Sequence, residues 1–201
     1  MTELILASQS PARMQILKAA GFNPKSIPST VDEDAVLHPE KAESPEQYVQ
    51  ILSNAKATNV SDSLGQGDYL VIGADSALSF ENQILGKPLE KETAIDRWKQ
   101  MRGKTGELFS GQTLIDTKTG DATTSLSSTK IWFEDITDDE IHRYVDSGEP
   151  LQVAGAFTID SLGGGFIRKI EGDYHTVVGL SLNLLREMMA ELGYQYTDFW
   201  K

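Results

Sequence analysis

The protein is a chain of 201 residues, of which 39% are hydrophobic and 24% are charged. This length and composition allow one globular domain over residues 1–201, or two small lobes that share one sheet, and we expect no separable linker. Thirty acidic residues against 18 basic ones give a formal net charge of −12. That charge argues against binding to a nucleic acid polymer, which needs a basic face. The absence of cysteine excludes disulfides, thiolate metal sites and cysteine nucleophiles.

The apolar segments of the sequence are short. The longest runs are about six residues, whereas a membrane-spanning helix needs roughly 20. No basic stretch precedes the first apolar run at residues 4–7, so we expect no signal peptide. These features predict a soluble intracellular protein with no membrane partner.

The N-terminal part predicts a strand, a helix and a second strand. Residues 4–7 fit a short buried strand. Ser10 and Pro11 fit the N-cap and first position of a helix that ends at Gly21. Residues 27–31 fit a second strand, and we expect the acidic stretch 32–46 to be mainly a solvated loop.

The middle of the chain predicts two further helices separated by a strand. Ser44 and Gln47 fit a capping box that opens a helix. Residues 69–73 predict an apolar strand, and residues 92–101 predict a helix with one apolar side.

The C-terminal half predicts a hairpin and two helices. Residues 107–116 and 122–134 fit paired strands joined by a polar turn. A capping box at residues 137–140 opens a helix that stops at Gly148, and residues 181–192 form the last helix. This alternation predicts an α/β or α+β fold, with a mixed sheet covered by helices.

A first group of candidate site residues follows the strand at residues 4–7. Ser8, Ser10 and Arg13 lie at the start of the predicted helix, where free N–H groups and the helix dipole attract anions. A cation in the first turn opposes the dipole unless an anion binds there. The alternative is that Ser10 only caps the helix and Arg13 is solvated.

Asp75 is the second candidate, because it follows an apolar strand. A carboxylate at the carboxyl end of such a strand lies where α/β sheets bind ligands, and it needs a cation, a metal or a proton if it is desolvated. The alternative is that Asp75 begins a turn.

Two lysines are weaker candidates. Lys87 lies between Gly86 and Pro88, in a rigid turn from which its ammonium group could reach a phosphate. Lys56 lies at the flank of the apolar side of its helix and either points into a cleft or extends to solvent. An exposed turn lysine is the simpler interpretation of Lys87. The small residues of segment 148–157 most simply indicate a tight turn.

The stretch Asp32-Glu33-Asp34 offers a competing hypothesis, since it fits the Asp-x-Asp-x-Val pattern of aspartyl-nucleophile phosphatases. That chemistry needs Asp32 at the end of a buried strand. The preceding residues are polar and include Pro28, which argues against this hypothesis.

Taken together, these segments resemble the Maf family of nucleoside-triphosphate pyrophosphatases, also described as septum-formation inhibitors. The match runs nearly end to end and is closer to an actinobacterial-type branch. The motifs that carry it are Ser8-x-Ser10-Pro11-x-Arg13, Asp32-Glu33, Ala55-Lys56-Ala57, Gly73-Ala74-Asp75-Ser76, Leu85-Gly86-Lys87-Pro88, Gly148-Glu149-Pro150, Ala154-Gly155-Ala156-Phe157 and Gly172-Asp173-Tyr174.

The resemblance implies a two-lobed α/β fold with an elongated mixed sheet, similar to inosine-triphosphate pyrophosphatases, and a nucleotide cleft between the lobes. It implies metal-dependent hydrolysis of nucleoside triphosphates to a monophosphate and pyrophosphate, with Mg or Mn as the divalent cation. It also implies clearance of modified nucleotides, a link to division arrest, a cytoplasmic location and often a homodimer.

The resemblance also assigns roles to the candidate residues. Asp75 becomes the general base or a carboxylate next to the metal, and Glu33 helps to hold the metal. The triphosphate is met by a set of hydroxyl and cationic side chains, namely Ser8, Ser10, Arg13, Lys56 and Lys87.

Four positions depart from the common family pattern, namely Ala12, Gly106, Val153 and Asp160, where many members carry Arg, His, Lys and Gln. These changes bear on the base preference more than on the reaction. They are also the one feature that favours an alternative, a nucleotide-binding regulator of septum formation without catalysis.

Overall fold

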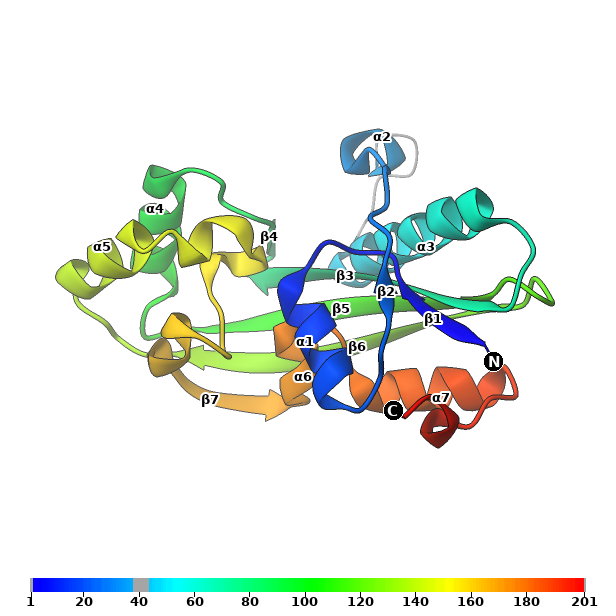
Figure 1. Ribbon diagram of the computed structural model, residues 1–201. Helices are drawn as coiled ribbons and strands as arrows, with labels where there is room; N and C mark the ends of the chain where they lie inside the picture. The colour runs from blue at the N-terminus through cyan, green and yellow to red at the C-terminus, as the bar shows by residue number, and fades with distance from the viewer. Residues whose placement is uncertain (1, 38–43, 201) are drawn as a thin grey trace. The chain divides into compact units, whose positions relative to one another are not determined.

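The computed structural model describes residues 2–37 and 44–200 (Figure 1). In these residues seven strands form one mixed sheet in the order β2-β1-β3-β5-β6-β7, with β4 paired to β3. The strands are β1 (Glu3–Leu6), β2 (Lys25–Ser26), β3 (Tyr69–Phe80), β4 (Gln83–Leu85), β5 (Thr105–Asp116), β6 (Ala122–Phe133) and β7 (Ile167–Gly172).

Helices alternate with the strands along the chain. The α-helices are α1 (Pro11–Ala19), α2 (Glu33–Leu37), α3 (Pro45–Leu64), α4 (Lys91–Met101), α5 (Asp138–Asp146), α6 (Tyr174–Val178) and α7 (Leu182–Glu191). Short 3-10 helices are η1 (Glu149–Gln152), η2 (Ala154–Ala156), η3 (Leu162–Phe166) and η4 (Tyr196–Phe199).

The chain forms two compact units, each built from separate segments. Unit 1 comprises Met1–Asp75, Ser110–Ser127 and Gly179–Lys201, and unit 2 comprises Ser76–Phe109 and Ser128–Val178. Strands β3, β5 and β6 each contribute residues to both units.

In unit 1, α3 lies directly against the backbone of two strands. A Cβ atom on Gly73 of β3 would lie 2.3 Å from the carbonyl oxygen of Ser53, and one on Gly111 of β5 would lie 2.4 Å from that of Val49. Both strand positions therefore need glycine for the helix to approach. β1 runs parallel to both β2 and β3.

Unit 2 has a core around Trp98 of α4, which is fully buried. Its indole Nε1 donates to the carbonyl of Ala156 at 2.7 Å, which satisfies its polar atom. The ring makes edge-to-face contacts with Phe133, Tyr144 and Phe166 at centroid distances of 5.6–5.8 Å. This packing joins α4, α5, β6 and η3 into one core.

The predicted hairpin and helix caps, which depend on residues close together in the chain, are confirmed. The hairpin joins β5 to β6 through residues 117–121, close to its predicted ends. Ser10, Ser44 and Ser181 each cap the predicted helix by accepting a backbone N–H, and Thr137 opens α5 with a complete capping box.

Two predictions in the region 27–46 are wrong. The second strand is β2 at Lys25–Ser26 instead of residues 27–31, because Ile5 and Leu6 of β1 pair with those two residues. Part of the expected loop 32–46 is helical, since α2 forms at Glu33–Leu37 and packs against α3. Residues 38–43 of that loop lie outside the described residues.

The strand predicted at residues 69–73 is longer than expected. β3 continues to Phe80, because the residues after Asp75 include the buried Ala77 and Leu78 and pair with β4. Glu81 and Asn82 turn the chain with φ of 48° and 64°, as a tight hairpin turn requires. Asp75 therefore lies within a strand and not at its end.

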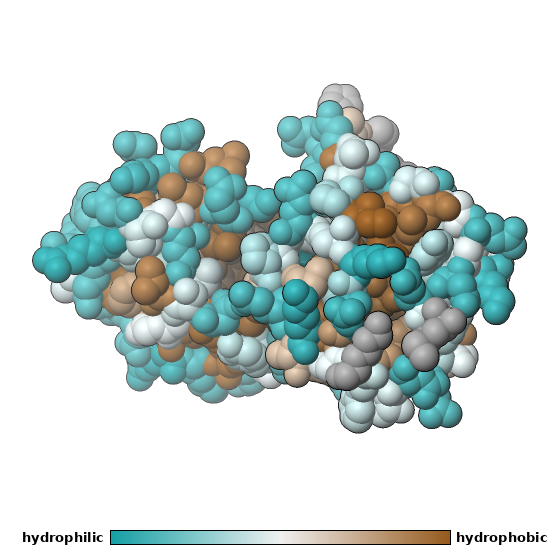
Figure 2. Space-filling view, in the orientation of Figure 1, coloured by the Kyte–Doolittle hydropathy of each residue, from teal (hydrophilic) through white to brown (hydrophobic). Residues whose placement is uncertain are grey.

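The described residues contain no helix that is long and apolar enough to cross a membrane. The face of the molecule in Figure 2 is largely hydrophilic, with hydrophobic residues in small patches. Large exposed apolar side chains include Leu89, Leu162, Tyr174 and Trp200. Scattered residues of this kind are ordinary on a globular surface.

Candidate active site

The N-terminus of α1 brings three of the predicted site residues together in unit 1. Ser10 caps the helix, since its hydroxyl accepts the N–H of Arg13 at 3.4 Å. The Ser8 hydroxyl accepts the N–H of Ser10 at 3.1 Å and an Nη1 hydrogen of Arg13 at 3.3 Å. The Arg13 side chain is therefore held beside the free N–H groups of the helix, which favours an anion there.

Lys56 of α3 lies between two carboxylates. Its Nζ atom is 2.5 Å from Oδ1 of Asp75 and 2.8 Å from Oε1 of Glu33. The side chains of Lys56 and Asp75 are only 14% and 12% exposed, whereas that of Glu33 is 48% exposed. The structure thus joins Glu33, Lys56 and Asp75 across α2, α3 and β3.

Burial controls the ionisation of this cluster. Desolvation raises the pKa of Asp75, although the positive charges of Lys56 and Arg13 oppose that shift. Desolvation also lowers the pKa of Arg13, which Asp75 and Glu33 counteract. A carboxylate whose pKa is raised toward neutrality is suited to accept a proton in catalysis.

Tyr48 of α3 is not among the predicted site residues. Burial raises its pKa to about 12, and the negative charges of Asp75, Glu33 and Asp34 add to that shift. The Tyr48 phenol therefore stays neutral at pH 7 and lies within the electric field of the acidic cluster. Nothing in the sequence around Tyr48 indicated that it would lie close to this acidic cluster.

Lys87 belongs to unit 2 and is exposed. The Gly86 carbonyl beside it accepts hydrogen bonds from Arg97 Nη1 at 2.6 Å and from the Gly155 N–H at 3.2 Å, which anchor the turn to the rest of unit 2. The interaction of Lys87 with a phosphate stays a prediction. Segment 148–157 packs into unit 2, where a Cβ on Gly155 would meet Leu78 at 2.8 Å, which supports its structural interpretation.

The aspartyl-phosphatase hypothesis does not fit the structure. Asp32 is exposed and follows an irregular segment, whereas that chemistry needs it at the end of a buried strand. Its Oδ1 atom accepts the N–H of Ala35 at 3.2 Å, so Asp32 caps the start of α2.

Two polar residues of β5 in this region were not predicted. Ser110 and Gln112 are fully buried. The Ser110 hydroxyl lies 3.3 Å from the carbonyl of Asp75 and 3.4 Å from that of Gly179, which also accepts Nε of Arg13 at 2.8 Å. Nothing in the sequence singled them out, because β5 also contains the polar residues Glu107, Thr113 and Asp116.

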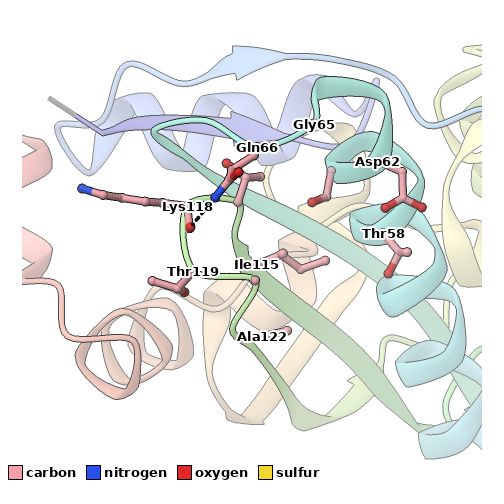
Figure 3. A pocket seen from close by; sticks show the side chains of 11 residues that line it. Thr58, Asp62, Gly65, Gln66, Ile115, Lys118, Thr119 and Ala122 are labelled. Atoms are coloured by element: carbon pink, nitrogen blue, oxygen red, sulfur yellow. Dashed lines mark hydrogen bonds between the residues drawn. The ribbon is translucent and has the colours of Figure 1, made fainter.

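A separate pocket of about 600 Å³ lies in unit 1 between the C-terminal end of α3 and the β5–β6 turn (Figure 3). Thr58 and Asp62 line it from the helix, and Ile115 and Thr119 line it from the hairpin. Its lining includes none of the predicted site residues, so the pocket is distinct from the cluster around Asp75.

The carboxylates of this cluster are candidate ligands for a divalent cation. No group of three or more His, Cys, Asp or Glu residues suited to a metal occurs in residues 2–37 and 44–200. Glu33 and Asp75 nevertheless converge on one cation, the Lys56 ammonium group. Two carboxylates fit Mg²⁺, which commonly takes one or two from the protein and the rest of its ligands from substrate phosphates and water.

The fold and these side chains define an α/β protein with a candidate site for a small anion, in which cationic side chains adjoin a desolvated carboxylate. Comparison with known protein families identifies the particular family. The chain belongs to the Maf family, whose model, described as Maf-like protein, matches residues 3–192. The resemblance expected from the motifs is therefore confirmed.

Similar proteins from several bacteria carry one name, nucleoside triphosphate pyrophosphatase. The protein from Leifsonia xyli subsp. xyli is 48% identical over 98% of this chain and 96% of its own length. The protein from Corynebacterium glutamicum is 47% identical, and that from Trichodesmium erythraeum 43%, each over 98% of both chains.

The solved structure of the Staphylococcus aureus Ham1 protein is similar in fold, with a TM-score of 0.50 and 12% sequence identity over 95% of this chain and all of that one. This likeness concerns the fold alone. It confirms the expected mixed α/β architecture. The expected nucleotide cleft stays a prediction.

Proposed function

We propose that the protein hydrolyses nucleoside triphosphates to a nucleoside monophosphate and pyrophosphate. The observation that carries this proposal is the cluster of Arg13, Lys56, Glu33 and Asp75, which combines cations for phosphate with a desolvated carboxylate. The names of the relatives, which are 43–48% identical over nearly the whole chain, support the same reaction.

In the proposed reaction, Asp75 acts as the general base. It accepts a proton from a water molecule whose oxygen bonds to the α-phosphorus. The bond from that phosphorus to the bridging oxygen breaks, and pyrophosphate leaves with the electron pair. Phosphoryl transfer depends mainly on positioning and on neutralising charge. Both are supplied by the residues that meet the triphosphate, namely Ser8, Ser10, Arg13, Lys56 and Lys87.

Glu33 and Asp75 are the residues that would hold a divalent cation, with Mg²⁺ or Mn²⁺ as the expected ion. When bound, such a cation neutralises charge on the phosphates. The Lys56 ammonium group contacts both carboxylates. A cation held there would compensate both carboxylate charges, and Lys56 would then be able to contact the phosphates instead.

We extend the proposal to modified triphosphates as substrates, with clearance of such nucleotides and a link to division arrest as the biological role. Purified protein would be incubated with common, methylated and deaminated triphosphates, with Mg²⁺ or Mn²⁺ and with a chelator. Pyrophosphate and orthophosphate would be measured separately. The expected products are pyrophosphate and monophosphate, and the chelator should remove both.

Asp75→Asn should abolish this turnover, because the amide cannot accept the proton. Asp62→Asn is the matched control, since Asp62 is a carboxylate of the same unit that lines the separate pocket of Figure 3. Normal turnover in Asp75→Asn would rule out the proposed base. Tight triphosphate binding with no product for any substrate would instead favour a non-catalytic regulator.

A further inference from the structure

We infer that Gln112 and Ser110 are positioning residues, which orient the Arg13 guanidinium group for phosphate through the backbone turn at residues 179–181. The inference rests on the proposed function, because it assigns the anion that Arg13 meets to the phosphates of the substrate. All the residues involved belong to unit 1.

The side-chain amide of Gln112 contacts the backbone of Ser181. The backbone N–H of Ser181 donates to Oε1 of Gln112 at 2.5 Å, and Nε2 of Gln112 donates to the carbonyl of Ser181 at 3.2 Å. One side-chain amide therefore satisfies both backbone groups of a residue that is 69 positions away. Gln112 and Ser181 are 0% and 2% exposed, so water does not compete for these hydrogen bonds.

The contact with Gln112 helps to fix the backbone turn at residues 179–181. Ser181 is also the N-cap of α7, and its hydroxyl accepts the N–H of Leu184 at 3.3 Å. Its backbone is thus fixed on one side by α7 and on the other by Gln112. Two residues earlier, Gly179 has a φ of 120°, which glycine adopts far more readily than other residues. This conformation sets the direction of the Gly179 carbonyl.

The Arg13 side chain is hydrogen-bonded to this turn. Its Nε hydrogen donates to the Gly179 carbonyl at 2.8 Å, and Nη1 donates to Ser8 at 3.3 Å. Two anchors fix the plane of a guanidinium group, and that plane decides whether it can meet phosphate oxygens in pairs. A displaced Gly179 carbonyl would keep the charge of Arg13 but turn its plane.

Ser110 links this turn to the proposed base. Its hydroxyl lies within hydrogen-bond distance of both the Gly179 carbonyl and the carbonyl of Asp75. Ser110 and Gln112 lie two residues apart on β5, so their side chains project on the same face of the strand. One face of β5 therefore contacts both the carbonyl that anchors Arg13 and the backbone of Asp75.

The test is the affinity for inorganic pyrophosphate with Mg²⁺, measured by calorimetry, together with KM and kcat for a triphosphate substrate. Gln112→Met keeps the length of the side chain and removes both polar atoms. We expect the Kd for pyrophosphate and the KM to rise about tenfold, as for other residues that orient a ligand-binding side chain, and kcat to change less.

The matched control is Thr117→Val. Thr117 is also a buried polar residue of unit 1, and its hydroxyl contacts the backbone of Gly67 and Tyr69 instead of the turn at 179–181. It should lower the melting temperature as Gln112→Met does but leave the Kd within about twofold, which is close to measurement error. An equal rise in the Kd of the control would reduce Gln112 to a general stabilising role and overturn the inference.

A double-mutant cycle with Arg13→Lys gives the most specific readout. If Gln112 acts through Arg13, Gln112→Met should change the Kd for pyrophosphate little once the guanidinium group is gone. A full tenfold change in the Arg13→Lys background would refute the inference that Gln112 acts through Arg13.

If Gln112→Met does not fold, Ser110→Ala is the deciding variant. We expect it to raise the Kd for pyrophosphate, and an unchanged Kd would overturn the inference. A wild-type protein that binds pyrophosphate but hydrolyses no triphosphate would refute the proposed function while these affinities still test the positioning.

Discussion

At the scale of single residues, Asp75 shows a conflict between function and stability. The strand β3 leaves the Asp75 side chain only 12% exposed, and the pKa is raised by that burial despite two neighbouring cations. A raised pKa means that the folded state favours the protonated carboxyl more than the unfolded state does. Ionisation of Asp75 therefore lowers the stability of the fold, and this loss grows as the pH rises from the ordinary carboxyl value through the raised pKa.

Asp75→Asn should consequently raise the free energy of unfolding at pH 7 while turnover is lost. The gain should shrink as the pH falls from the raised pKa toward the ordinary carboxyl value, and it should vanish below that value, where the wild-type Asp75 is protonated in both states. Urea unfolding at several pH values measures this. A clear loss of stability at pH 7 would contradict the prediction.

Asp116→Asn is the control for this change. Asp116 is also buried, but its Oδ2 accepts the Tyr194 hydroxyl at 2.8 Å and its Oδ1 accepts the Lys118 N–H at 2.8 Å. Weakening these hydrogen bonds to a carboxylate should lower the stability by about 1–2 kcal/mol, in the opposite direction to Asp75→Asn.

At the scale of elements, the close contact between α3 and β3 places Lys56 beside Asp75. In Gly73→Ala the new methyl group would lie 2.3 Å from a backbone oxygen and 2.7 Å from a backbone nitrogen of α3. Because no flexible side chain can move aside, the helix must shift. We expect a loss of about 1–3 kcal/mol of stability and a lower kcat/KM, measured by unfolding and by pyrophosphate release.

Gly165→Ala is the control for the helix contact, because a Cβ there has nothing within 4 Å. It should retain both stability and kcat/KM. If Gly73→Ala also retained its kcat/KM, the position of α3 would not matter for the site.

In unit 2, Glu149 joins η1 to the segment before η3. Its Oε1 accepts the hydroxyls of Thr158 at 2.5 Å and Tyr144 at 3.0 Å and the N–H of Gly163 at 2.9 Å. Burial alone would raise the pKa of Glu149, but these hydrogen bonds outweigh it and lower the pKa to about 2. The carboxylate therefore contributes stability above pH 4.5, and this is lost as the pH falls toward 2.

Glu149→Gln should destabilise the protein by about 1–3 kcal/mol at pH 7 and by progressively less as the pH falls toward 2. Thermal unfolding across that pH range measures the difference. Glu140→Gln is the control, since Gln also completes the α5 capping box and should change stability by less than about 0.5 kcal/mol. A pH-independent effect of Glu149→Gln would show that the charge is not what stabilises this segment.

The elements also show how far the sequence could predict the structure. Caps, the β5–β6 hairpin and the apolar side of α4 depend on residues close in the chain, and these predictions were confirmed. The lengths of β3 and β2 depend on pairing with β4 and β1, which local patterns do not encode. The Gln112–Ser181 contact joins residues 69 positions apart, so only the fold could reveal it.

The candidate site likewise combines features that the local sequence predicts with features that depend on tertiary contacts. The motifs around Ser8, Lys56 and Asp75 marked residue types suited to phosphate chemistry. The contact of Lys56 with Glu33 depends on α2, which the acidic composition of residues 32–46 did not predict. That short helix packs against α3, so tertiary contacts and not its own sequence stabilise it.

At the scale of the whole molecule, the two units share their strands. β3, β5 and β6 each begin in one unit and end in the other. Neither unit can therefore unfold without disrupting strands that the other one uses. Such a chain should unfold in a single cooperative transition, as small domains usually do.

This can be tested with one probe in each unit. With Trp132 and Trp200 replaced by phenylalanine, the fluorescence of Trp98 reports on the core of unit 2, and hydrogen exchange of the buried residues Ile5 and Leu6 reports on unit 1. The two probes should give the same free energy of unfolding. The decisive variant is Glu149→Gln, because its contacts lie entirely in unit 2. If the strands couple the units, this substitution lowers the protection of Ile5 and Leu6 by the same 1–3 kcal/mol that Trp98 reports. Protection in β1 that stayed at the wild-type level would mean that the units unfold separately, and a stabilising residue in unit 2 would then leave the Asp75 site in unit 1 unaffected.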